Sequence, residues 1–337
     1  MYLKELTELR GVPGDETQVR DFIFDKIKDK CDEIYRDSIG NLIAVKRCKK
    51  ENAKKVMVCA HMDEVALIIT KITDEGFLKF DTLGGIDTTV MVSKKVLVGE
   101  NAINGVIGAK AIHLQKKSER NKGIEIEELY IDIGAKDKKD AEKRVSLGDF
   151  ATFDSEYVEF GDGFIKAKAL DDRVGCDVMI DLADYQYEFD LYLVFTAQEE
   201  TGLRGATIAA NRIMPDFAMV LETTACADTF GSEEKDFSTV SGGGVALSFA
   251  DLRTYYSKEI LKDISSVAKK HNIPYQYKRT ISGGNDAGAI HLSCGGVRTI
   301  VMSVPTKYIH SPSSVINVSD YRAMKDLALK YLQEGKL

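Results

Sequence analysis

The chain has 337 residues, of which 44% are hydrophobic and 29% are charged, and its formal net charge is −7. This length suits one large domain with a smaller one, and the composition is that of a globular protein. The negative charge argues against a nucleic-acid partner, which usually requires a basic face. The N-terminus lacks the apolar core of a signal peptide, and no apolar run approaches the roughly 18 residues of a membrane span. We therefore expect a cytoplasmic protein with no membrane partner.

The six cysteines contain no C-x-x-C pair, and several lie in apolar, strand-like runs. C-x-x-C spacing is the usual sign of a metal-binding or redox-active cysteine pair, whereas disulfides require an oxidising compartment. Because no secretory signal is evident, we expect reduced, buried thiols.

In the first half of the chain, the pattern of residues changes near residue 66. Asp15 and Gln18 resemble a capping box, and the apolar residues that follow fall on one helical face. Strands are predicted over 42–45 and 55–60. From about 66 to about 167, short β-rich runs are separated by Gly, Asp and Lys clusters. This pattern predicts a compact all-β unit.

After residue 169 the pattern alternates between strands and helices, which is typical of an α/β sheet covered by helices. We expect strands at 191–197, 217–221, 275–280 and 297–304, and helices near 172–187, 203–212, 256–271, 285–293 and 319–334. The simplest architecture is an α/β domain with a helix-covered mixed sheet, built from residues 1–65 and 167–337. A β-rich domain, residues 66–166, is inserted into it.

Acidic residues and histidines gather at the ends of the predicted strands. They are His61, Asp63 and Glu64 after 55–60, Glu199 and Glu200 after 191–197, Glu222 after 217–221, His310 a short loop after 297–304, and Asp171 with Asp172 before a helix. In open α/β sheets, ligands bind outside the carboxyl ends of the strands. Four strand ends that each deliver such a residue therefore indicate one site.

The types of residue indicate what this site could do. Two histidines and at least three carboxylates, with no thiolate, suit a pair of divalent ions. A two-metal site activates water and polarises a scissile carbonyl. The adjacent Glu199 and Glu200 can divide the remaining work, one as a metal ligand and the other as general base. Metal-assisted hydrolysis is the predicted chemistry.

Each of these residues also has a structural interpretation. His61 alone could be a core histidine, Asp171 or Asp172 could cap a helix, and the glutamates could be a charged turn or surface residues. The conjunction at strand ends favours a site. The sequence also lacks G-x-S-x-G, H-E-x-x-H and the glycine-rich phosphate motifs, which argues against serine hydrolases, single-zinc proteases and nucleotide binding.

Several long motifs resemble one known family. They are GVPGDE at 11–16, HMDEV at 61–65, ALDDRVGC at 169–176, TAQEETGLRGA at 196–206, GGNDAGAIHL at 283–292 and VPTKYIHSP at 304–312. In this order they are similar to the tetrahedral aminopeptidases, the glutamyl- and leucyl-type enzymes of metallopeptidase family forty-two. The resemblance covers essentially the whole chain. It implies a fold of the phosphorylase/hydrolase-like, zinc-exopeptidase type.

The resemblance implies a role for each site residue. His61 and Glu222 would bind one metal ion and His310 and Glu200 the other, with Asp171 bridging the two. Glu199 would be the general base. Asp63 would hydrogen-bond His61 and orient it.

The resemblance also implies cofactors and partners. The cofactors would be two divalent ions per subunit, with zinc or cobalt most usual, and the substrates would be peptides. The inserted domain would form dimers that assemble into a dodecamer. Three positions depart from the family pattern: Glu222 stands for the usual Asp, Ala66 for Gly and Asn285 for a common Thr. The extra methylene of Glu222 moves its carboxylate by about 1.5 Å, so it puts the affinity of the His61 metal in question.

The prediction is an aminopeptidase that removes N-terminal residues, with its side-chain preference left open. One alternative is a deacylase of N-acyl amino acids, which uses the same metal chemistry. A glycanase, a label that some relatives carry, would need two carboxylates and no metal, leaving the histidines unexplained. A non-catalytic assembly is the third alternative.

Overall fold

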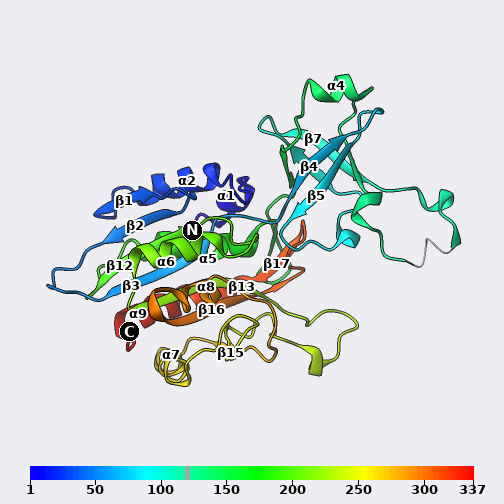
Figure 1. Ribbon diagram of the computed structural model, residues 1–337. Coiled ribbons are helices and arrows are strands. Elements are labelled where there is room, and N and C mark those ends of the chain that lie inside the picture. Colours follow the sequence, from blue (N-terminus) through cyan, green and yellow to red (C-terminus); the bar gives the residue numbers. More distant parts are fainter. Residues whose placement is uncertain (118–121) are drawn as a thin grey trace.

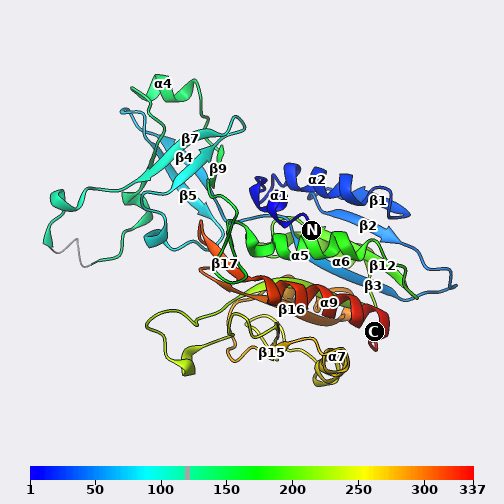
Figure 2. The ribbon, with the colours of Figure 1, turned by 180° about the vertical axis from the view of Figure 1, so that it is seen from behind.

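The computed structural model describes residues 1–117 and 122–337. Figures 1 and 2 show a helix-covered sheet beside a smaller barrel. The sheet is built from both ends of the chain, whereas the barrel strands lie within residues 66–153. The predicted mixed α/β fold with a separate β unit is confirmed at this level.

The large sheet has eleven strands, and its centre is parallel. Along its main path the order is β1 (Glu33–Arg36), β2 (Leu42–Lys46), β12 (Asp190–Thr196), β3 (Lys55–His61), β13 (Phe217–Ala225), β16 (Arg298–Lys307), β17 (Ser314–Asn317), β11 (Phe164–Ala167) and β10 (Val158–Phe160). Beside β16, β14 (Val245–Leu247) pairs with it and with β15 (Tyr275–Tyr277). The strands β12, β3, β13 and β16 are parallel neighbours, so their carboxyl ends share one edge.

Helices cover both faces of this sheet. On one face, α5 (Leu170–Leu182) and α9 (Val318–Glu334) pack together, with α1 (Leu3–Glu8) and α2 (Thr17–Ile27) against α5 and α7 (Lys258–Lys270) against α9. On the other, α6 (Arg204–Ile213) and α8 (Ala287–Ile290) pack together. Short 3-10 turns are η1 (Thr88–Val90), η2 (Ile112–Leu114), η3 (Ile126–Glu128), η4 (Glu234–Asp236) and η5 (Ser293–Gly295).

Two local predictions are corrected. Strand β13 continues to Ala225, so Glu222 lies inside the strand rather than after it. Helix α2 begins at Thr17 and has no side-chain cap, so the capping box at Asp15 does not form. The reason is that Asp15 pairs with Val12 in a β-bridge.

The barrel has six antiparallel strands and its own apolar core. Its strands are β4 (Ala66–Ile72), β5 (Leu78–Leu83), β8 (Tyr130–Asp132), β7 (Ile103–Gly108), β6 (Lys95–Val98) and β9 (Phe150–Phe153). Closure leaves the barrel no free edge for unwanted pairing. The unit is not purely β, because it carries the short helix α4 (Lys138–Glu142). The chain returns to the large sheet before residue 166, because β10 and β11 pair within that sheet.

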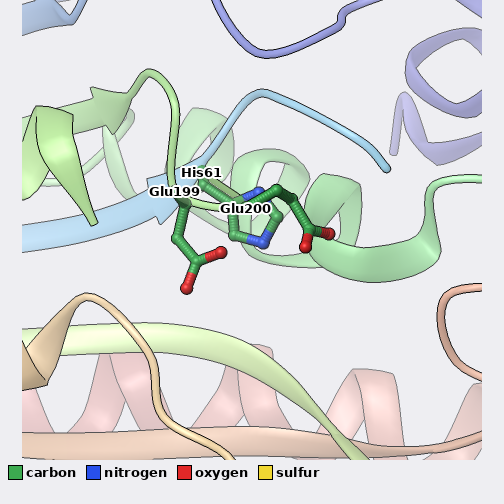
Figure 3. Close-up of side chains that lie close together, drawn as sticks. All are labelled: His61, Glu199 and Glu200. Atoms are coloured by element: carbon green, nitrogen blue, oxygen red, sulfur yellow. The ribbon is translucent and has the colours of Figure 1, made fainter. Parts of the chain in front are cut away.

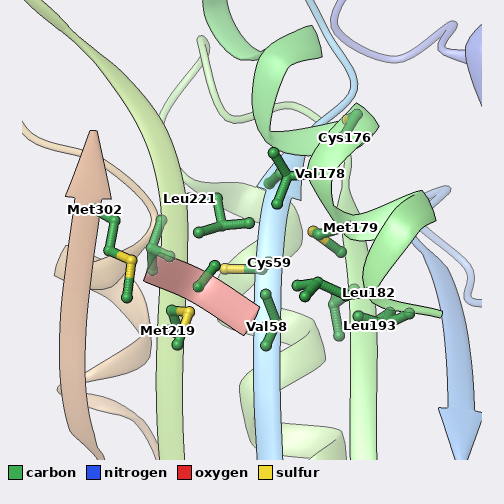
Figure 4. Packing of buried hydrophobic residues seen from close by; sticks show 14 of the residues in the cluster. Val58, Cys59, Cys176, Val178, Met179, Leu182, Leu193, Met219, Leu221 and Met302 are labelled. Carbon is green, nitrogen blue, oxygen red and sulfur yellow. The ribbon is translucent and has the colours of Figure 1, made fainter. Parts of the chain in front are cut away.

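The main core lies between the sheet and its helices. Figure 4 shows Cys59 on β3 among Val58, Met219 and Leu221, with Cys176 on the nearby α5. Burial raises the pKa of both thiols, so they stay neutral and pack as small apolar groups. All six cysteines are free. Within the described ranges, no helix combines the length and apolarity that crossing a membrane requires.

Candidate active site

The edge where the parallel strands end brings together six of the residues predicted for the site. His61 is the last residue of β3 and pairs in register with Thr196 at the end of β12. Glu199 and Glu200 follow in the next loop, and Figure 3 shows all three side chains at this edge. The other members are Asp171, Glu222 and His310, and all six line one cavity of about 500 Å³.

Asp171 lies between the two histidines. Its Oδ1 is 3.4 Å from Nε2 of His61, and its Oδ2 is 3.2 Å from Nε2 of His310. The carboxylate thus turns one oxygen to each imidazole. Such a carboxylate can bridge two cations, each held by one of the histidines.

Each histidine also faces a second carboxylate. Oε1 of Glu222 is 3.6 Å from Nε2 of His61, and Oε1 of Glu200 is 3.6 Å from Nε2 of His310. Two three-residue sets that contain Asp171, His61–Asp171–Glu222 and Asp171–Glu200–His310, therefore hold their ligand atoms within 4.8 Å of one another. A third set, His61–Glu199–Glu200, meets the same distance. The glutamate at position 222 reaches this cluster despite its extra methylene.

Two buried carboxylate oxygens without hydrogen-bond partners indicate whether a metal ion fits this site. Oδ1 of Asp171 and Oε1 of Glu200 are buried and accept no hydrogen bond. A buried carboxylate oxygen left without a partner is costly. Both atoms belong to the two ligand sets, and nitrogen with oxygen donors suits divalent ions. The residues present therefore fit a pair of cations.

The pKa values of the site residues also indicate that cations bind here. Burial, reinforced by the charge of Asp171, raises the pKa of Glu222 to about 8 and that of Glu200 to about 7. Burial also raises the pKa of Glu199 well above its ordinary value. Burial opposes the charging of His310, but Asp171 and Glu200 outweigh it and raise its pKa to about 9. Such a crowd of buried acids needs positive charge to remain ionised.

Main-chain carbonyls orient both imidazoles. Nδ1 of His61 lies 2.9 Å from the carbonyl oxygen of Asp63, and Nδ1 of His310 lies 2.9 Å from that of Gly85. A proton on Nδ1 that is donated to a carbonyl leaves the Nε2 lone pair free for a metal. Gly85 belongs to the loop after β5, so the inserted unit helps to orient His310.

The carboxylate of Asp63 has a different contact from the one expected. It lies 3.6 Å from Nδ1 of His61, whereas its two oxygens accept the backbone N–H groups of Glu199 (3.0 Å) and Glu200 (3.1 Å). Asp63 therefore holds the loop that carries both glutamates, and its backbone carbonyl contacts His61.

A buried ion pair supports the loop after β3. Nζ of Lys168 donates to Glu64 at 2.6 and 2.9 Å and to the carbonyl of Leu9 at 2.8 Å. Nε of Arg173 donates to the carbonyl of Met62 at 3.0 Å. Glu64 follows a strand end, as the site residues do, but its carboxylate stabilises the fold through this ion pair.

Several supporting residues could not be recognised from the sequence. Asp286 accepts a hydrogen bond from Thr196 at 2.6 Å beneath the site, and burial raises its pKa to about 6. Gly84, at φ +89°, lets the loop approach Glu200, since a Cβ there would lie 3.1 Å from Oε2 of Glu200 and 2.8 Å from Val65. Thr196 and Asp286 lie in two of the motifs quoted above, TAQEETGLRGA and GGNDAGAIHL, but neither motif indicates that the two side chains meet. Only the packing of distant segments creates these contacts.

Glu16 is a further buried acid near the site, and it gives a pH-dependent prediction. Burial, and then the charge of Asp63, raise the pKa of Glu16 from 4.5 to about 7. The neutral form is favoured in the folded state. The resulting stability is fully present below about pH 4.5 and is lost as the pH rises through about 7.

We therefore expect wild type to gain stability relative to Glu16→Gln as the pH falls from about 8 to about 5. Denaturant titrations of both proteins at several pH values measure this difference. Because the site acids are common to both proteins, their titration largely cancels. A difference that does not change with pH would contradict the assignment.

With this geometry established, the comparisons identify the family. The sequence matches the M42 glutamyl aminopeptidase family over residues 40–327. The chain belongs to the M42 aminopeptidase family. A candidate aminopeptidase of Acetivibrio thermocellus is 40% identical, over 94% of this chain and 93% of its own. The resemblance found in the motifs is thereby confirmed.

Two solved structures show the same likeness. The TET1 peptidase of Pyrococcus horikoshii, described as assembling into a tetrahedron or an octahedral shell, superposes with a TM-score of 0.86 at 32% identity, covering 98% of both chains. A Thermotoga maritima protein described as an endoglucanase gives 0.82 at 38% identity, covering 99% of this chain and 97% of its own. Membership of the M42 family makes the protein an enzyme, a hydrolase that acts on peptide bonds.

Proposed function

We propose that this M42 protein is a dinuclear metal-dependent aminopeptidase that uses a glutamate as general base. The observation that carries the proposal is the placement of Asp171 between two histidines, each of which faces a second carboxylate. His61, Glu222 and Asp171 would hold one divalent ion, and His310, Glu200 and Asp171 the other. When bound, the two ions would supply Lewis acidity toward a water molecule and the scissile carbonyl. Zinc or cobalt is the proposed metal.

The protein's own acid–base group in this scheme is Glu199. Its carboxylate lines the same cavity and lies within 4.8 Å of ligand atoms of His61 and Glu200, but each of the two sets that share Asp171 is complete without it. We assign it the transfer of a proton from water to the leaving amine, first as base and then as acid. Asp63 would fix the loop that carries it, through the two backbone hydrogen bonds.

The alternatives differ in the bond that they break. A deacylase would act on an N-acyl amino acid, and a glycanase would act on a sugar bond with two acids alone. The glycanase leaves both histidines without a role, although one relative of solved structure is described as an endoglucanase. The ligand sets therefore favour amide hydrolysis.

The experiment compares an unblocked peptide with its N-acetylated form and with a soluble β-glucan. Release of the N-terminal amino acid from the unblocked peptide alone supports the aminopeptidase. Hydrolysis of the acylated substrate alone would support the deacylase, and sugar release would support the glycanase. No turnover of any substrate would support a non-catalytic assembly.

The cavity wall also favours acidic N-terminal residues, in line with the name of the family. Arg253 and Lys278 both line the cavity. Among the described residues, the Arg253 guanidinium has no ion pair or hydrogen bond. Its stem lies against Gly284 and Gly288, where an added Cβ would come within 2.7 and 2.6 Å of it.

Asp251 also lines the cavity, and its charge acts on Lys278, but its carboxylate oxygens make no ion pair with Arg253. Oδ1 of Asp251 accepts two backbone N–H groups at 2.8 Å, and its Oδ2 accepts the hydroxyl of Tyr256 at 2.6 Å. A substrate carboxylate would therefore meet the unpaired Arg253 guanidinium, whereas a lysyl side chain would meet repulsion from it.

Replacing Arg253 by Gln should lower kcat/KM for a glutamyl p-nitroanilide by about 10- to 100-fold, the loss of one charge-assisted hydrogen bond. The leucyl substrate should change by less than threefold. Arg279→Gln is the matched control, because Arg279 is exposed and does not line the cavity. An equal loss on both substrates would contradict the assignment.

We also propose that the chain forms homo-oligomers, through the inserted unit and in a dodecamer. Support comes from the assemblies described for the TET1 relative. Large apolar side chains are also strongly exposed, with Ile112 at 68% in the inserted unit and Tyr255 at 85% outside it. Light scattering of the purified protein measures the assembly directly.

A further inference from the structure

Four consecutive backbone N–H groups of the loop after β12 are each held by a buried side-chain oxygen. Ala197 donates to Oδ1 of Asn41 at 2.8 Å, and Gln198 donates to Oε1 of Glu16 at 3.1 Å. The N–H groups of Glu199 and Glu200 donate to Asp63. Every acceptor comes from a segment that is distant in sequence. Asn41, Glu16 and Asp63 thus hold the loop that carries both functional glutamates.

Burial and a second hydrogen bond fix the Glu16 side chain beside Gln198. Its side chain is 1% exposed, and Oε1 also accepts the N–H of Gly14 at 2.8 Å. Glu16 occupies the N-cap position of α2, yet its side chain caps nothing in that helix. Because Gly14 has φ +93°, the chain can turn there and direct Glu16 toward Gln198.

Asn41 is oriented just as firmly. It is fully buried, and its Nδ2 donates to Oδ2 of Asp37 at 2.7 Å and to the carbonyl of Gly205 at 2.9 Å. These two bonds fix which end of the amide faces Ala197. A Cβ at Gly205 would come within 2.2 Å of Oδ1 of Asn41, so the close approach requires glycine there.

The held loop departs from regular backbone. Gln198 has φ +58°, in the left-handed region that a non-glycine residue seldom adopts. Such a conformation persists when its surroundings determine it. With the hydrogen bonds of Glu16 and Asn41 removed, the loop could relax and carry the Glu199 and Glu200 carboxylates away from their partners.

We propose that Glu16 and Asn41 are positioning residues that hold the 197–200 loop so that Glu199 and Glu200 reach the reacting atoms and the metal. This rests on the proposed roles of those two glutamates. A displacement of about 1 Å at such groups can cost about a hundredfold in rate. The N-terminal segment that carries Glu16 is thereby part of the catalytic apparatus, although it does not line the cavity.

The test compares three variants of the full-length protein. Glu16→Leu removes the acceptor, Glu16→Gln keeps an oxygen in its place, and Asp320→Leu is the matched control. Asp320 is also a buried carboxylate that accepts two backbone N–H groups, from Gly242 and Gly244, away from the cavity. The measurements are thermal unfolding, zinc affinity by equilibrium dialysis, kcat and KM.

We expect Glu16→Leu to lower kcat by about 10- to 100-fold at saturating zinc, with KM changed by less than threefold. Glu16→Gln should restore kcat to within about threefold of wild type, and Asp320→Leu should lose stability but keep kcat. Should Glu16→Leu not fold, Glu16→Asp, which shortens the side chain, replaces it with the same expected loss.

Two results would overturn the proposal. One is a folded, zinc-loaded Glu16→Leu with wild-type kcat. The other is an equal loss in Glu16→Leu and Glu16→Gln, since the hydrogen-bond acceptor would then be irrelevant. If wild type hydrolyses no peptide, the proposed function fails, and zinc affinity decides: a weaker affinity in Glu16→Leu than in Glu16→Gln supports positioning of Glu200, and equal affinities refute it.

Discussion

Replacing Glu199 by Gln is expected to lower kcat by about 10²- to 10⁴-fold, the usual contribution of a general acid–base group. The amide is nearly isosteric with the carboxylate and cannot take a proton from water. The backbone of residue 199 still donates to Asp63, so the loop keeps its place. Because Glu199 is not a member of the Asp171 ligand sets, both metal ions should remain bound, as elemental analysis of the dialysed protein would show.

Glu200→Gln is the matched comparison, one residue further along the same loop. Oε1 of Glu200 faces His310, so this variant should lose metal affinity first and activity as a consequence. Excess metal should then recover part of its activity but none of that of Glu199→Gln. Near-wild-type kcat in Glu199→Gln would refute the base assignment.

Asp171→Asn should lower activity by an amount similar to that expected for Glu199→Gln, but through the loss of bound metal ions. The substitution removes the charge between His61 and His310. Two bound ions would then repel each other without the shared carboxylate. We expect fewer than two metal ions per subunit after dialysis and a loss of several kcal/mol of transition-state stabilisation, about a thousandfold or more in kcat/KM.

Asp181→Asn is the control for this experiment. Asp181 lies on the same helix α5 but pairs with Lys325 away from the cavity. This variant should keep both ions and full activity. An Asp171→Asn protein that still bound two ions per subunit as tightly as wild type would show that this carboxylate is not the bridge.

Much of the architecture could be predicted from the sequence because its signals are local. Apolar runs mark the parallel strands β3, β12, β13 and β16, and the residues directly after such strands must meet at one edge. That single rule brings His61, Glu200 and His310 together without any structure. The extent of β13 could not be predicted as well, because Glu222 interrupts the apolar run while the ladder to β16 continues to Ala225.

The supporting contacts could not be read from the sequence, because they join segments that are distant along the chain. Glu16 and Gln198 are separated by 182 positions, and Gly85 and His310 by 225. Asp15 looks like a helix cap when read locally. Pairing with Val12 removes it from that role and leaves Glu16 turned toward the site. Tertiary packing therefore determines which of these side chains caps the helix and which contacts the site.

The most direct test of the account is hydrolysis of glutamyl, leucyl and lysyl p-nitroanilides by chelator-treated protein, before and after zinc, cobalt or manganese is returned. We predict no release without metal, restored release with at least one ion, and the fastest release from the glutamyl substrate. Undiminished release by protein shown to be free of metal would contradict the dinuclear site, as would an absence of release with every ion.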